Sequence, residues 1–99
     1  MAIILQWPDK DSGETLDYTL DWTARLNLNH GDTIASSSWA ITGGGDTVLT
    51  LSSSSHTSYT STVWASSGTV GANYRITCTV VTTGSRTLVQ SVYLRIVQR

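Results

Sequence analysis

The side chains of this chain that could act as nucleophiles or bases come from two histidines, fourteen serines and one cysteine. His30 and His56 both lie in polar segments, and no serine stands in the Gly-x-Ser-x-Gly pattern that presents a nucleophile on a sharp turn. With so many serines, a serine beside a histidine is expected by chance. Two histidines 26 residues apart, without a cysteine pair, do not have the spacing of a zinc site. We therefore predict that the protein is not an enzyme and has no metal ion or cofactor.

One short acidic segment has part of the pattern of a calcium loop. Asp9 and Asp11 stand at alternate positions, and in calcium loops alternate carboxylates converge on the ion. The next alternate position is Gly13, however, and the distant glutamate of an EF-hand is missing. A polar hairpin or an Asx turn is the favoured interpretation.

The elements that must position these residues are β-strands, because apolar and polar residues repeatedly alternate. In residues 74–80, Tyr74, Ile76, Cys78 and Val80 alternate with polar residues, as in a strand with one face against a core. Immunoglobulin-like and fibronectin-type sandwiches enter their F strand through a turn-rich corner, with a tyrosine whose hydroxyl bonds back to that corner. Tyr74 follows the turn-rich residues 68–73 and fits this position. The alternative is a strand that begins with tyrosine in another β fold.

Turn signals about every 8–12 residues separate seven such strands. We predict the other strands at residues 2–7, 16–22, 33–42, 48–53, 59–66 and 88–97. Residues 24–32 are expected to be a compact crossover without a helix of any length, and the serine-rich residues 52–58 a loop. The predicted fold is all-β: an immunoglobulin-like or fibronectin-type antiparallel β-sandwich of about seven strands, in a single domain that spans residues 1–99.

Strand parity also predicts the core. Trp39 takes the place of the buried tryptophan on strand C of immunoglobulin-like domains, so its replacement by alanine is expected to cost about 3–5 kcal/mol. Cys78 has no partner for a disulfide and is expected to be buried and unreactive. The full predicted core is Leu20, Trp22, Trp39, Tyr74, Ile76, Cys78, Val80 and Leu94.

Charge is divided along the chain, with −5 in residues 1–50 and +4 in residues 51–99. This division argues against a uniformly basic face for nucleic acid, and no apolar run is long enough to span a membrane. The opening residues lack the basic start of a signal peptide. Two oppositely charged regions favour docking or self-association, although local pairing of the charges is an equal alternative. The candidate interface residues are Asp17, Asp21, Trp64, Arg75, Arg86, Tyr93 and Arg95.

Two motifs stand out, Leu-Asp-Tyr-x-Leu-Asp-Trp-x-x-x-Leu at 16–26 and Gly-Asp-Thr-Ile-Ala-x-Ser-x-Trp at 31–39, together with segments 62–74 and 86–96. Through them, most of the chain from Trp7 onward resembles a family of small proteins encoded among the virion structural genes of tailed bacteriophages. The resemblance implies an immunoglobulin-like accessory virion protein. The single cysteine and the missing signal peptide favour synthesis in the host cytoplasm, and the split charge and the candidate interface residues favour binding to capsid, neck or tail proteins or to other copies of the chain. Its position on the particle is not implied. Residues 52–58 depart from the family pattern.

A carbohydrate-binding module is the alternative function. In such a module an exposed tryptophan stacks on a sugar, and Trp64 and Trp7 are the candidates. A sugar-binding protein would change its tryptophan fluorescence with glycans as an isolated monomer, whereas a virion protein would sediment with particles.

Overall fold

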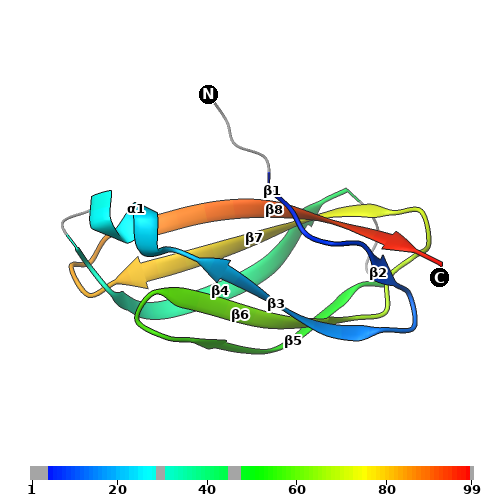
Figure 1. The fold of residues 1–99 in the computed structure, drawn as a ribbon, viewed down its shortest axis with the longest axis horizontal. Helices are drawn as coiled ribbons and strands as arrows, with labels where there is room; N and C mark the ends of the chain where they lie inside the picture. Colours follow the sequence, from blue (N-terminus) through cyan, green and yellow to red (C-terminus); the bar gives the residue numbers. More distant parts are fainter. Residues whose placement is uncertain (1–4, 29–30, 45–47, 99) are drawn as a thin grey trace.

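The computed structural model describes residues 5–28, 31–44 and 48–98. Two β-sheets pack as two layers, and α1 (Thr23–Leu28) lies at one end of them (Figure 1). One sheet has the order β3 (Thr15–Asp21), β6 (Thr60–Ser66), β5 (Thr50–His56). The other has the order β1 (Leu5–Gln6), β8 (Thr87–Val97), β7 (Asn73–Thr82), β4 (Ile34–Gly43), and β2 (Lys10–Asp11) also pairs with β8. The predicted all-β sandwich is therefore confirmed.

The strand order matches that of a constant-type immunoglobulin sandwich. β3, β6 and β5 take the places of strands B, E and D, and β4, β7 and β8 those of C, F and G. The long pairings β3–β6, β5–β6, β4–β7 and β7–β8 are antiparallel. β1 and β2, however, run parallel to β8, so this edge departs from the antiparallel pairing of the rest of the sandwich. Pro8 lies between these two short strands and has no N–H to donate to a ladder.

Tyr74 forms the predicted tyrosine corner. Its side chain is fully buried, and its hydroxyl accepts a hydrogen bond from the backbone N–H of Thr69 at 3.0 Å. Gly68, at the same corner, has a φ of 108° and lies so close to Ile96 that a Cβ atom would stand 2.7 Å from its side chain. The corner therefore needs glycine there for both its backbone conformation and its packing.

The core lies between the sheets. Seven of the residues expected there are buried: Leu20, Trp22, Tyr74, Ile76, Cys78, Val80 and Leu94. Trp39 differs, because it is only partly buried and packs against the core from its margin. β4 is the edge strand of its sheet, and an opening of about 180 Å³ lies between Trp39 and residues 51–54 of β5. Trp22, at 1% exposure, is the most deeply buried tryptophan of the described residues.

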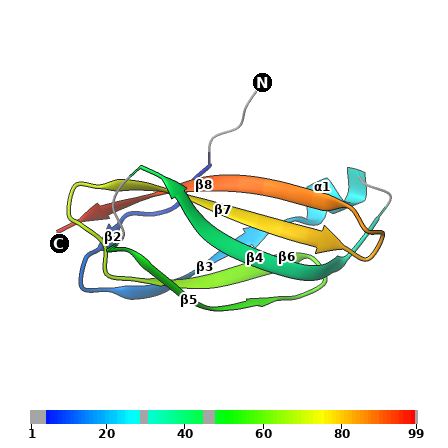
Figure 2. The ribbon, with the colours of Figure 1, turned by 180° about the vertical axis from the view of Figure 1, so that it is seen from behind.

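Two other segments differ from expectation. Residues 54–56, predicted within a loop, belong to the edge strand β5, which has a register shift between Ser52 and Ser55 and a positive φ of 47° at Ser53. A strand at a sheet edge can be exposed almost throughout, so serine content alone does not exclude it. Residues 23–28 form α1, a helix of six residues where none of any length was expected. Figure 2 shows β5 and β4 from the opposite side of the molecule.

Cys78 is expected to be inert to thiol reagents in the folded protein. Its side chain is fully buried, its Sγ lies 3.6 Å from the Ser61 Oγ, and desolvation raises the pKa of the thiol to about 11. Labelling near neutral pH should therefore be slower by a factor of about 100 or more than in denaturant. The measurement is the labelling rate against denaturant concentration. Rapid labelling without denaturant would contradict the register of β7.

Candidate interaction surfaces

The outer face of the β3–β6–β5 sheet carries an exposed tryptophan beside an acid. Trp64 of β6 is 40% exposed and lies directly opposite Asp17 of β3 and Ser52 of β5. The next row holds Thr19 and Thr62, whose hydroxyls are hydrogen-bonded at 2.8 Å. We call these five residues the Trp64 face. It offers one large apolar side chain and a carboxylate on a flat polar surface.

Asp21 ends the same strand and has a local structural role. Its Oδ1 accepts hydrogen bonds from the hydroxyl of Thr23 at 2.6 Å and from the Thr23 N–H at 2.9 Å, so it supports the start of α1. These two bonds lower the pKa of the carboxyl group, with the side-chain bond the larger cause. Asp21 therefore stays ionised and adds negative charge at the end of β3.

Three of the predicted interface residues lie on the outer face of the opposite sheet. Arg75 pairs with Tyr93 and Asn73 with Arg95, so the two arginines are diagonal neighbours on β7 and β8. Val89, 50% exposed, lies on the same face of β8. We call Arg75, Val89, Tyr93 and Arg95 the arginine face.

Arg75 is fixed on this face by contacts with the neighbouring strand. Its Nε donates to the Thr42 hydroxyl at 3.0 Å, and its Nη2 donates to the Thr42 carbonyl oxygen at 2.7 Å. Because these bonds already hold the Arg75 side chain in place, less side-chain entropy is lost when a partner binds to it.

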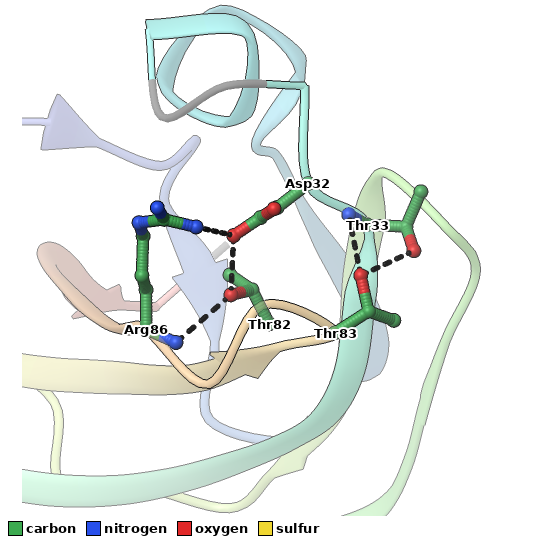
Figure 3. Close-up of polar contacts among 5 residues, drawn as sticks. All are labelled: Asp32, Thr33, Thr82, Thr83 and Arg86. Carbon is green, nitrogen blue, oxygen red and sulfur yellow. Dashed lines mark hydrogen bonds and ion pairs between the residues drawn. The ribbon is translucent and has the colours of Figure 1, made fainter.

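Arg86 is separate from the arginine face, because it lies in the hairpin between β7 and β8, where it forms an ion pair with Asp32. Its Nη1 lies 2.8 Å from the Asp32 Oδ2, which also accepts a hydrogen bond from the Thr82 hydroxyl at 2.7 Å (Figure 3). The hydroxyl of Thr82 in turn accepts the Arg86 N–H at 3.0 Å. This network ties the β7–β8 hairpin to the segment before β4. Asp32 and Arg86 thus follow the alternative in which opposite charges from the two halves of the chain pair with each other within the fold.

Sequence reasoning missed the buried Lys10. Its side chain has 0% exposure, and its Nζ donates to the carbonyl oxygens of Ser67 at 2.7 Å and Asp11 at 2.8 Å. Desolvation lowers the pKa of the amine, while Glu14 and Asp11 oppose the shift. Lys10 stands between two acids at alternate positions. That alternation was a signal that it points inward.

The acids around Lys10 are used by the turn between β2 and β3. Asp11 Oδ1 accepts the N–H of Gly13 at 2.7 Å, which is the favoured Asx turn, and Glu14 Oε1 accepts the N–H of Asp11 at 2.8 Å. In the described part of the chain, no three His, Cys, Asp or Glu side chains converge as metal ligands would. His56 is exposed on β5, and His30 lies outside the described residues.

Trp7 is a poor candidate for a sugar platform. It is 8% exposed and stacks on Tyr18 with ring centroids 4.5 Å apart. Trp64 is therefore the one of the two predicted tryptophans that presents its ring to solvent. Across the described residues, no helix has the length and apolarity needed to cross a bilayer.

Comparison with known families gives a match over residues 10–95 to a family described as podophage GP4 fiber-tail adaptor protein gp77. That stretch runs from β2 to near the end of β8. The chain belongs to this adaptor family. No curated protein sequence matches it significantly. The protein is thus a small, all-β accessory structural protein of the tailed-phage virion, as the resemblance of the sequence implied, and the matched family associates it with the tail.

Proposed function

We propose that this member of the fiber-tail adaptor family joins a tail fibre to the tail, and that it contacts one of them with the Trp64 face and the other with the arginine face. The observation that carries the proposal is the placement of Asp17 and Trp64 on the outside of one sheet and of Arg75 and Arg95 on the outside of the other. An adaptor needs two surfaces that can be occupied at once. Opposite faces of a sandwich meet this need, because the core separates them.

The two faces combine apolar anchors with charge of opposite sign. The apolar surface comes from Trp64 on one face and from Val89 and the half-buried Tyr93 on the other. Removing this surface from water on binding lowers the free energy of the complex. Exposed charges contribute little affinity each but select orientation and partner. The protein therefore acts through protein contacts, and its two partners should present surfaces of opposite charge.

The test uses two double variants of the full chain. Trp64→Ala with Asp17→Asn should weaken binding to one partner about tenfold or more and leave the other partner's binding unchanged. Val89→Ser with Arg95→Gln should have the converse effect. Val70→Ser is the control, because Val70 is 48% exposed but lies in the turn before β7 and belongs to neither face.

Binding is measured separately to fibres and to tail particles that lack the protein. Loss of the same partner in both double variants, or normal binding to both partners in each, would contradict the proposal. Melting curves of each variant exclude unfolding as the cause.

A further inference from the structure

β3 is an unusual strand for its place in this fold. In a constant-type sandwich, strand A lies beside strand B. Here β1 and β2 pair with β8 instead, so in the part of the chain that the structure describes β3 pairs with β6 alone. Its other edge has no neighbouring strand there, although the strand is seven residues long and contains no proline.

The backbone groups that face this edge follow from one hydrogen bond. The N–H of Trp22 donates to the carbonyl oxygen of Tyr59 at 2.8 Å, one position beyond the Asp21–Thr60 pair. Because backbone groups alternate in direction along a strand, those of Leu20 and Tyr18 point to β6 as well. The N–H and C=O groups of Asp17 and Thr19 therefore point to the open edge. Both residues are exposed.

A groove runs along the same edge. It has a volume of about 390 Å³ and is lined by Trp7, Pro8 and residues 16–19. The stacked rings of Trp7 and Tyr18 make its wall apolar. The edge thus combines free ladder positions with room for apolar side chains, which are the two features by which a sheet binds an added strand.

The charge around the groove points to a basic occupant. Residues 9–21 contain five acids, and their single cation, Lys10, is buried. Asp17 lines the groove itself. The outer edge strands β4 and β5 contain no lysine or arginine, so a second copy would bring no cation on those strands. Charge complementarity therefore favours a different protein.

We propose that the open edge of β3 binds an extended segment of another virion protein as an added strand, and that this segment carries lysine or arginine beside apolar residues. The inference rests on the proposed function, since it specifies one of the two contacts of the adaptor. Backbone bonds at Asp17 and Thr19 set the register, the groove takes an apolar side chain, and the acids attract the cations.

The first test separates the backbone from the side chain at one position. Thr19→Pro and Thr19→Val both remove the hydroxyl and its bond to Thr62, and neither removes a backbone bond to β6, but only the proline variant loses the outward N–H. Binding to one of the two partners should be about tenfold or more weaker in the proline variant than in the valine variant. Equal binding by both variants would overturn the proposal. If the two Thr19 variants bound equally but the Trp64→Ala, Asp17→Asn double variant still lost a partner, the strand-addition proposal would fail and the proposed function would stand.

The second test does not depend on the proline variant folding. A photo-crosslinking phenylalanine derivative replaces Thr19 in assembled particles, with the exposed Val70, in the turn before β7, as the control position. The expected product joins Thr19 to a segment of a fibre or tail protein that contains lysine or arginine. Crosslinks to a second copy, to residues 1–4 of the same chain or to a segment without these cations would overturn the proposal, as would the absence of any crosslink.

Discussion

Replacing Trp22 by alanine is expected to leave most of the protein unfolded under conditions in which the parent is folded. The indole is 1% exposed and is among the largest fully buried side chains of the described structure. Its removal should cost about 3–5 kcal/mol, which is a large share of the stability of a domain of this size. Trp22 also precedes α1, and its carbonyl oxygen accepts the Leu26 N–H at 2.9 Å, so the loss should reach the helix.

The measurement is the free energy of unfolding in denaturant. Trp64→Ala is the matched control, because it removes the same side chain from the outer face of β6, where 40% of it is exposed. It should cost less than about 1 kcal/mol. Trp39→Ala should fall between the two, since Trp39 is only partly buried. Equal costs at Trp22 and Trp64 would show that the assignment of the core is wrong.

Lys10→Ala is the second substitution with a large expected effect, and it should lower the free energy of unfolding by about 2–4 kcal/mol. The effect is large although Lys10 lies in a segment that is acidic and otherwise mostly exposed. The substitution leaves a cavity and removes the donor to the Ser67 carbonyl oxygen, which joins β2 to the corner before β7. Lys10→Met keeps most of the volume and should cost less. Exposed Arg95→Ala is the control, with a change below about 0.5 kcal/mol.

Lys10 should also leave a signature in the pH dependence of stability. Because burial lowers its pKa below 10.5, the folded protein binds fewer protons than the unfolded chain between the lowered pKa and 10.5. The contribution of Lys10 to the unfolding free energy therefore rises with pH in that interval. The difference between the parent and Lys10→Met should rise in the same direction. A difference that stays flat or falls with pH would show that the folded protein does not lower the pKa of the amine.

Much of the fold follows from strand parity. Tyr74, Ile76 and Cys78 alternate with polar residues, and the structure places all three in the core. Parity predicts which way a side chain points but not how well its strand is covered. For this reason Trp39 was predicted to be in the core, whereas it is only partly buried. It points inward, opposite Cys78, but from an edge strand beside an opening. Whether a strand lies at the edge or in the centre of its sheet depends on the topology, and the residue pattern of one strand does not contain the topology.

The candidate surfaces were less accessible to sequence reasoning, because charge along a chain is not charge in space. Asp32 and Arg86 lie on opposite sides of the −5 and +4 division, yet they pair at 2.8 Å across 54 residues. Asp17 and Arg95 share no contact, because their strands belong to different sheets. The open edge of β3 was not predictable at all, since it arises from the choice of β8 as the partner of β1 and β2.

The orientation of the protein in the assembled tail tests the adaptor proposal most directly. Cryo-electron microscopy of particles, at a resolution that separates the two sheets, measures it. We predict that the Trp64 face and the β3 edge lie against one of the two components, fibre or tail, and that the arginine face lies against the other. A map in which both components contact the same sheet, or in which the outer face of either sheet is open to solvent, would contradict it.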